Sequence, residues 1–442
     1  MMKRFCKALS ILLIFMFTVT LFAGCGSTEN KTPDAKTPET KQGEKAEAKK
    51  ITVIIPKHEM DTKGFFEQKT REFEKASGIQ VEFISMSWDN VADKITAEMA
   101  TNGTSFDVME FDNAWVAKFV TNGWVAPLDE FLTEDMKNGI LPGLLEKFSY
   151  KGQHYGIPWN NDTRFFMYNK KKLADAGISA PPKTWTELAE QSKILKSKGL
   201  VKYGFIDSLM QAQSGTNELT YFVYTFGGDF LDKDSKPAAS GDKGVKAAYE
   251  FLSKGLQEDK IIDPASVSSD YQTVANVFLK GDTAFFVQAW PGVYTMADDP
   301  SVSKIKGEIA VAPYALGADE SSAKVLTLPE AYAIPQSSKN KKEAWEYIKF
   351  MSSKDFDKQK GQEIGALPIW KDNFNDADLL KMYPYWESFG KQSQNAKGLQ
   401  DILWYDEMSN IVQVESLKIL MNKASADEGL KTMDEQFKKK MR

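Results

Sequence analysis

Between residues 51 and 111, short apolar segments rich in β-branched residues alternate with amphipathic segments. Residues 51–55, 79–84 and 106–111 are predicted strands. In the intervening stretches 65–76 and 91–99, apolar residues repeat with helical spacing. Strands and helices that alternate at this interval predict βαβ units and a mostly parallel sheet, so the fold class is α/β.

The loops after these strands are the first candidates for a binding site. In sheets of parallel strands, ligands bind beyond the carboxyl ends of the strands. Here those ends are the loops at residues 57–61, 85–90 and 112–115.

The rest of the chain continues the alternation in a less regular way. Residues 150–159 predict a hairpin, and the PPKTW segment predicts a helix start with Thr184 as N-cap and Glu187 three residues on. Further strands are expected at 282–290 and 330–335, and from Ile402 the pattern is almost wholly helical.

Composition excludes several classes of function. The 442 residues carry a net charge of −5, and residues 1–24 contain three basic and no acidic side chains, so their removal gives −8. An acidic chain without basic clusters argues against a nucleic-acid partner. The two histidines, His58 and His154, are too few for a multi-histidine metal site, and no cofactor is expected.

The first 24 residues have the pattern of an export signal, with three basic residues before an apolar run that is too short for a membrane span. Small residues directly before Cys25 resemble the bacterial lipobox, in which the cysteine is lipidated and becomes the mature N-terminus. Phe22 departs from the leucine usual at that position. The alternative is an ordinary signal peptide with a chance cysteine.

Residues 25–50 are rich in Lys, Glu, Thr and Pro and have no large apolar side chain. Such a segment cannot bury enough surface to fold, and it predicts a flexible linker. Together with a lipidated Cys25, it places the folded part at the extracellular face of the cell membrane. With Cys6 in the signal and Cys25 lipidated, the mature protein would have no disulfide.

The segment GIPWNNDTRFFMYNKKKLADAGISAPPKTWTEL closely resembles the crossover segment of bacterial extracellular solute-binding proteins of the maltose-binding type. Supporting matches follow the order of that family and, with this segment, extend over nearly all of residues 51–442. They lie at residues 111–132, 278–294, 332–353 and 411–437.

The resemblance implies a two-lobed periplasmic-binding-protein-like fold of type II, with hinge crossovers near 160–162, 327–330 and 366–369 and a C-terminal helical segment. The N-terminal lobe would comprise residues 51–161 and 329–367, and the C-terminal lobe residues 162–328 and 368–442.

It also implies a function. Such a protein binds a small molecule between its lobes, closes on it by hinge motion, and is recognised by the permease subunits of an ABC importer. The chain is expected to act as a monomer and to perform no chemistry on its ligand.

A sugar site needs carboxylate or amide groups for the hydroxyls and aromatic planes for the apolar ring face. After the third predicted strand, Asp112, Asn113 and Trp115 combine both kinds of group, although Asp112 could equally cap a helix and Trp115 could be core.

The PWNND segment offers a second set, formed by Trp159, Asn160 and Asp162. By resemblance, Asp162 matches a position where sugar-binding members carry a cleft carboxylate. The alternative is a hinge residue that accepts backbone N–H groups.

The remaining candidates lie near later strands and predicted crossings. By resemblance, Trp290 matches a tryptophan on which sugar rings stack, and Glu330 stands where the family often has a Gly-rich turn. Glu330 could bind ligand hydroxyl groups or a cationic ligand, or it could face solvent. Further aromatic candidates are Trp88, Tyr221, Trp370 and Trp404.

Other functions stay open at this level. A secreted glycosidase could use carboxylates such as Asp112 and Asp162, although no catalytic signature accompanies them. His58 and Glu59 suggest a loop or a ligand contact rather than acid–base catalysis. On the same fold, the ligand could be a polyamine, a peptide or an organophosphate, and the protein could serve a membrane sensor.

Overall fold

The computed structural model describes residues 49–103, 105–319, 325–387 and 396–441. The predicted signal peptide, Cys25 and nearly all of the predicted linker lie outside these residues. The strands are β1 (Lys50–Pro56), β2 (Gln80–Met86), β3 (Val108–Asp112), β4 (Ser149–Tyr150), β5 (Gln153–His154), β6 (Ile157–Asn160), β7 (Phe165–Asn169), β8 (Phe285–Ala289), β9 (Ile309–Val311) and β10 (Glu330–Ala333).

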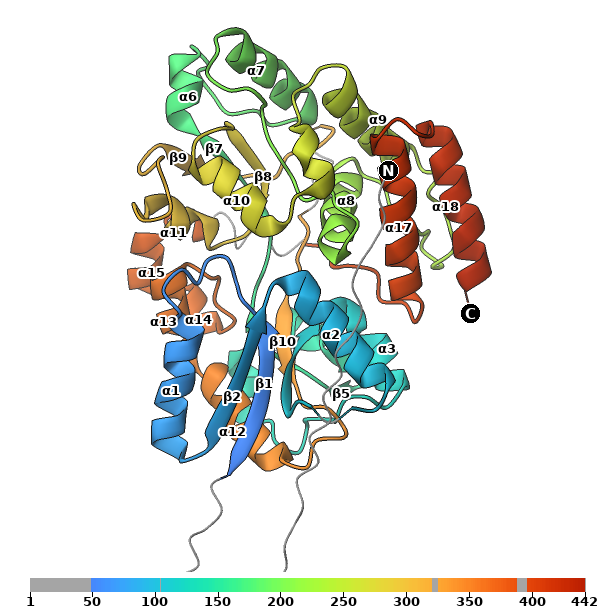
Figure 1. Cartoon of the computed structure of the whole chain (residues 1–442). Helices are drawn as coiled ribbons and strands as arrows, with labels where there is room; N and C mark the ends of the chain where they lie inside the picture. The colour runs from blue at the N-terminus through green and yellow to red at the C-terminus, as the bar shows by residue number, and fades with distance from the viewer. Residues whose placement is uncertain (1–48, 104, 320–324, 388–395, 442) are drawn as a thin grey trace, which may run out of the picture. The chain divides into compact units, whose positions relative to one another are not determined.

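The described strands form a five-stranded sheet, a three-stranded sheet and the two-stranded sheet β4-β5, and helices lie around the two larger ones (Figure 1). The helices are α1 (Phe65–Ser77), α2 (Trp88–Ala100), α3 (Val116–Thr121), α4 (Glu134–Gly139), α5 (Pro142–Glu146), α6 (Lys170–Asp175), α7 (Trp185–Ser197), α8 (Gln213–Thr225), α9 (Lys243–Gln257), α10 (Tyr271–Leu279), α11 (Val293–Asp298), α12 (Lys341–Met351), α13 (Lys354–Ile364), α14 (Lys371–Phe374), α15 (Ala377–Met382), α17 (Tyr405–Leu420) and α18 (Ala426–Lys440), with 3-10 helices at Asn113–Trp115 and Pro264–Ser268.

The larger sheet has the strand order β2-β1-β3-β10-β6. Its first three strands are parallel, as the sequence predicts, with β1 between β2 and β3. The central strand β1 is buried on both faces, since Val53 and Ile55 belong to the core cluster that includes α1 and α12, and Ile54 belongs to the cluster that includes α2. A nearly continuous apolar run is what a strand covered on both faces needs.

The prediction of a mostly parallel sheet is wrong beyond these strands. Strand β10 enters the larger sheet antiparallel to both β3 and β6. The smaller sheet, in the order β8-β7-β9, is antiparallel throughout. These pairings join segments that are far apart in the sequence, which periodicity does not report.

The chain passes from the larger sheet to the smaller one after β6. Strand β6 ends at Asn160 in the larger sheet and β7 begins at Phe165 in the smaller one, so residues 161–164 connect them. The chain returns between β9 and β10. At the C-terminal end, α17 packs against α8, α9 and α18 (Figure 1).

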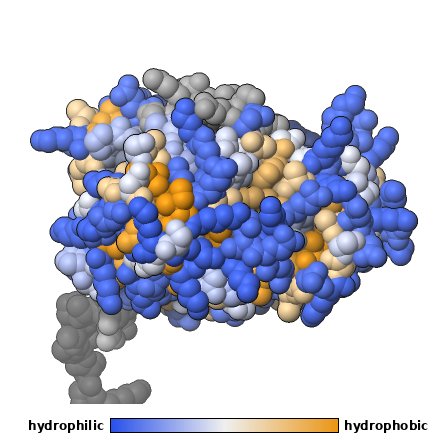
Figure 2. Space-filling model, turned by 90° about the horizontal axis from the view of Figure 1, so that it is seen from above, coloured by the Kyte–Doolittle hydropathy of each residue, from blue (hydrophilic) through white to orange (hydrophobic). Residues whose placement is uncertain are grey.

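The face of the molecule that Figure 2 shows is mainly polar. On the face seen in Figure 2, apolar residues occupy a few small areas within a hydrophilic surround. Among the described residues, no helix is both long and apolar enough to cross a membrane.

A buried ion pair on α13 contacts two backbone segments that are far apart in the sequence. Lys360 and Asp357 are fully buried, with Nζ 3.0 Å from Oδ1. Lys360 also donates to the carbonyl of Trp159 in β6, and Asp357 accepts from the backbone N–H groups of Ile369 and Trp370 at 3.0 and 3.1 Å. The pair therefore joins the start of the first crossover to the segment before α14.

Lys360→Met is expected to lower the free energy of unfolding by about 3–5 kcal/mol, because the Asp357 carboxylate would stay buried without its cation. Denaturation with urea measures this value. Lys358→Met on the same helix is the matched control, because its ion pair with Asp376 lies at the surface, and the expected change is below about 1 kcal/mol. Equal losses in the two variants would contradict the role assigned to the buried pair.

Candidate functional site

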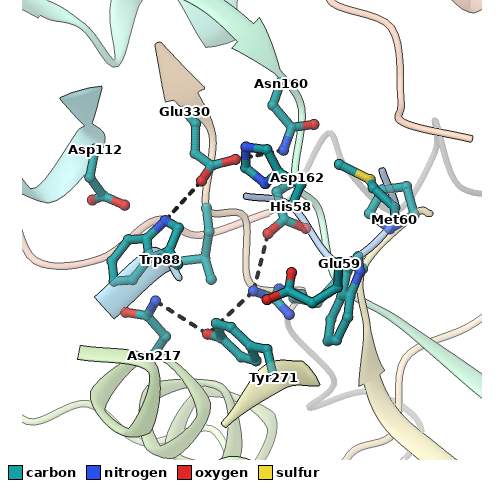
Figure 3. A pocket seen from close by; sticks show the side chains of 14 residues that line it. His58, Glu59, Met60, Trp88, Asp112, Asn160, Asp162, Asn217, Tyr271 and Glu330 are labelled. Carbon is teal, nitrogen blue, oxygen red and sulfur yellow. Dashed lines mark hydrogen bonds and ion pairs between the residues drawn. The ribbon is translucent and has the colours of Figure 1, made fainter. Parts of the chain in front are cut away.

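A cavity lies where the carboxyl ends of β1, β3 and β6 face residues of α8, α10 and the end of β8 (Figure 3). The cavity itself has a volume of about 40 Å³, and about 510 Å³ of space lies between the surrounding atoms when the part open to solvent is included. The lining residues are His58, Glu59, Met60, Trp88, Asp112, Asn160, Asp162, Arg164, Asn217, Tyr271, Trp290, Pro291, Leu328 and Glu330.

The position of β10 brings three of these side chains together. In the strand register, Glu330 is opposite Asp112 of β3 on one side and Asn160 of β6 on the other. Residues directly opposite each other in a sheet project from the same face. Glu330 accepts hydrogen bonds from Asn160 Nδ2 at 2.8 Å and from Trp88 Nε1 at 2.9 Å (Figure 3).

The first crossover segment presents alternate side chains to the cavity. Asn160, Asp162 and Arg164 line it, whereas Asn161 and Thr163 line a separate groove. This alternation is the geometry of extended backbone, which places successive side chains on opposite sides. A single extended segment thus connects the sheets and supplies three polar groups of the site.

Arg164 is the arginine of the cavity wall, and two carboxylates and two aromatic rings contact its guanidinium. Its Nη2 lies 3.1 Å from Asp162 Oδ2, and its Nη1 lies 3.6 Å from Glu218 Oε1. The guanidinium also lies over the rings of Tyr271 and Trp290, at 5.1 and 5.6 Å from their centroids. Such contacts orient a buried guanidinium by ion pairing and by cation–π attraction.

The carboxyl groups of the wall share a low-dielectric environment. Burial, and then the nearby Glu330 and Asp162, raise the pKa of Asp112 to about 7. Burial likewise raises the pKa of Glu59 to about 7, and it lowers the pKa of His58 to about 3, so this histidine is neutral. Burial penalises the charged form of each group.

Several buried polar atoms of the cavity lack a hydrogen-bond partner among the described residues. They include the acceptors Asn160 Oδ1 and Asp162 Oδ1 and the donors Arg164 Nε and Trp290 Nε1. Buried polar atoms in folded proteins nearly always have a partner. Together they mark this cavity as a place for a polar molecule.

Six of the residues proposed from the sequence line the cavity. They are Trp88, Asp112, Asn160, Asp162, Trp290 and Glu330. Asp112 and Asn160 end strands, and Trp88, Asp162 and Trp290 follow strands within two residues. Glu330 instead begins β10, and it was proposed from its position in the family pattern.

Three other candidates lie beneath the cavity wall or beside it. Trp159 is fully buried, stacks on Tyr332 and donates from Nε1 to Glu110 at 3.2 Å. Trp115 stacks on Phe119 with an interplanar angle of 12°. Asn113, in the 3-10 helix after β3, is buried and does not line the cavity.

The last three candidates are packing residues elsewhere. Tyr221 donates from its hydroxyl to the carbonyl of Val287 at 3.0 Å. Trp370 donates from Nε1 to the carbonyl of Ser352 at 2.9 Å. Trp404 packs edge-on against the ring of Phe437.

The other lining residues were not among the proposed site residues. His58, Glu59 and Met60 follow β1, in a loop indicated by the parallel-strand rule, and His58 and Glu59 were interpreted as a loop or a ligand contact. Arg164 could have been found from the alternation with Asn160 and Asp162. Asn217 and Tyr271 had no local signal, because α8 and α10 bring them to the cavity from distant parts of the sequence. Pro291 follows the candidate Trp290, and Leu328 lies in the predicted crossing at 327–330.

A further contact joins α2, the helix that follows β2 of the larger sheet, to the start of α8. Asp89 accepts from the backbone N–H and the hydroxyl of Ser214, at 3.2 and 3.1 Å. The N-cap residue of α8 is Ala212, which has no side-chain cap. Asp89 therefore caps α8 from another part of the fold.

The cavity between two α/β units, lined by residues from both, defines a ligand-binding protein. Residues 59–358 match the family model of bacterial extracellular solute-binding proteins, and the chain belongs to this family. The family binds small molecules and works with ABC transporter permeases. It is a family of binding proteins, so the chain is not an enzyme and the glycosidase alternative is withdrawn.

Relatives and solved structures agree with this assignment. A binding protein of Brucella abortus (strain 2308) is 26% identical over 394 residues, covering 87% of this chain and 92% of its own. The maltotriose-binding protein of Pyrococcus abyssi is 25% identical over 66% of this chain and 61% of its own. Maltose-bound T. maritima MalE3 has a TM-score of 0.81 at 23% identity, covering 88% of this chain and 99% of its own, which shows the two-lobed fold.

The raised pKa of Asp112 predicts a pH-dependent stability. The folded chain holds the proton more tightly than the unfolded chain does, so this stabilisation is present at acidic pH and is lost as the pH rises through about 7. Asp112→Asn removes this carboxyl group. The gain in the free energy of unfolding of the variant over the unmodified chain is expected to be roughly 2–3 kcal/mol larger at pH 8 than at pH 5.

Denaturation with urea at the two pH values tests this expectation. Asp93→Asn, an exposed position on α2, is the control and should show no such difference. A gain for Asp112→Asn that is independent of pH would refute the buried, uncompensated state of this carboxyl.

Proposed function

We propose that this chain is a lipid-anchored extracellular receptor that binds a carbohydrate in the cavity and delivers it to an ABC importer. The observation that carries the proposal is the wall itself, which combines the rings of Trp88 and Trp290 with carboxyl, amide and guanidinium groups.

This combination fits the two sides of a sugar ring. Trp88 and Trp290 offer aromatic surface for the apolar C–H face. Carboxylates such as Asp112 and Glu330 accept hydrogen bonds from hydroxyl groups, and Asn160 can both donate and accept. The maltotriose and maltose in the names of two similar proteins support a sugar, and an oligosaccharide in particular.

The proposed lobe boundaries and hinge motion supply the mechanism of capture. Residues 161–164 and the return to β10 border the cavity, so a rotation at these connections would open and close it. No group in this scheme reacts with the ligand; the protein only binds it and presents it to the permease.

A thermal-shift screen against mono- and oligosaccharides tests the ligand class, because a ligand that binds only the folded state raises the melting temperature. At least one oligosaccharide is expected to give a shift. Trp290→Ala should weaken the affinity for that sugar about tenfold or more in calorimetric titration, since one stacking surface is lost.

Trp124→Ala is the matched control, since Trp124 packs against Phe119 and does not line the cavity. Its affinity should equal that of the unmodified chain. A clear shift with a polyamine or a peptide, and none with any glycan, would overturn the proposed ligand class.

The anchor forms a separate part of the proposal and rests on the sequence around Cys25. Cys25→Ala is expected to release the protein from the membrane fraction into the medium while leaving the sugar affinity unchanged. Immunoblots of the two fractions measure this, with Cys6→Ala in the predicted signal as the control that keeps the protein attached. Retention of the Cys25 variant in the membrane would refute lipidation at this residue.

A further inference from the structure

The charges of the cavity wall are strongly unbalanced. Four carboxyl groups line it, those of Glu59, Asp112, Asp162 and Glu330, against the single guanidinium of Arg164. The wall also includes His58, but this ring is neutral because burial lowers its pKa to about 3. Acidic groups therefore outnumber cations in the wall, and burial raises the pKa values of Glu59, Asp112 and Asp162 to about 7, so near neutral pH protons neutralise only part of this excess.

The nearest cations already have carboxylate partners. Arg164 is paired with Asp162 at 3.1 Å and approaches Glu218 at 3.6 Å. Lys360, whose charge also acts on Glu330, is paired with Asp357 at 3.0 Å. Neither cation is available to neutralise a further carboxyl group.

Asp112 and Glu330 are consequently left with neutral donors. Asp112 accepts from the backbone N–H of Ala114 at 2.8 Å, and Glu330 accepts from Trp88 and Asn160. No ion pair of either group occurs within the described residues. The two side chains are opposite each other on β3 and β10 and are 2% and 5% exposed. Burial and then Glu330 raise the pKa of Asp112, and two buried carboxyl groups in this relation are stabilised either by a proton or by a cationic group of a ligand.

The unpartnered atoms of the wall provide an independent indication of the ligand. Asn160 Oδ1 and Asp162 Oδ1, on residues more than nine-tenths buried, are acceptors that need a donor. Arg164 Nε and Trp290 Nε1 are donors that need an acceptor. An ammonium group has three donors and no acceptor, whereas a sugar hydroxyl group can both donate and accept a hydrogen bond.

These requirements separate three classes of ligand. A polyamine would neutralise the carboxyl groups, but its ammonium groups would leave Arg164 Nε and Trp290 Nε1 without an acceptor. A neutral sugar would satisfy these donors but would leave the acidic charge uncompensated. A sugar with an amino group satisfies both, and aromatic rings such as Trp88 also favour a neighbouring cation.

We propose that the ligand is an amino sugar whose free ammonium group lies between Asp112 and Glu330, with its hydroxyl groups toward Arg164 and Trp290. This inference rests on the proposed carbohydrate function and specifies the class of sugar.

Matched pairs of sugars test it, because the members of a pair differ only in an amino or a hydroxyl group. The probes are glucosamine and glucose, galactosamine and galactose, and the β-1,4 dimer of glucosamine and cellobiose, with spermidine as a polyamine. Calorimetric titration should give at least about tenfold tighter binding for the amino member of every pair that binds.

Asp112→Asn and Glu330→Gln should reduce this preference to about twofold or less, because each removes one of the two charges that face the ammonium. Asp93→Asn, exposed on α2, is the control and should keep the full preference. Urea denaturation of each variant shows whether it is folded, and Asp112→Asn is expected to be more stable at pH 8.

The outcomes distinguish this inference from the function on which it rests. Binding of neutral sugars as tight as that of their amino partners would overturn the amino-sugar inference and leave the carbohydrate receptor intact. Binding of spermidine alone, or of no sugar of either kind, would overturn both.

Discussion

The binding site depends on the pairing of β10 with its two neighbours, β3 and β6. Strand β10 follows a long excursion of the chain through the smaller sheet, and it returns antiparallel to both neighbours. Its first residue, Glu330, is thereby fixed beside Asp112 and Asn160 at the edge of the larger sheet. Without this return, the carboxyl ends of β3 and β6 would have no acidic group between them.

The segment that connects the two sheets also carries charged side chains of the cavity. The segment 161–164 joins the sheets, and its alternating side chains place Asp162 and Arg164 at the cavity. Behind it, the buried pair of Lys360 and Asp357 holds the carbonyl of Trp159 and the backbone at Ile369. Asp162 and Arg164, which carry charge at the cavity, are therefore close to the buried ion pair that holds the backbone at the crossover.

Local patterns were sufficient to predict the first half of the larger sheet. The strands and helices from β1 to β3 follow from apolar periodicity, and Thr184 caps α7 by accepting from the N–H of Glu187, as predicted. The antiparallel smaller sheet was not predicted, because β7 pairs with strands more than 100 residues away in the sequence and no local periodicity encodes the partner.

The same distinction explains the site. Asp112 and Glu330 lie at strand ends, a position that can be recognised from the sequence. Tryptophans gave a weaker signal, because Trp159 and Trp370 were candidates like Trp290 but belong to the core and do not line the cavity. Tyr271 begins α10 and reaches the cavity only through the packing of that helix, so its role needed the structure.

The contact between Asp89 and Ser214 has a consequence for any motion of the two sheets. Helix α8 has no capping side chain of its own, and it receives one only while α2 lies against it. Separation of the two elements would expose the first N–H groups of α8 to solvent and remove a cap typically worth about 0.5–2 kcal/mol. The capping contact thus stabilises the arrangement in which α2 lies against α8, and this contribution comes from the chain alone.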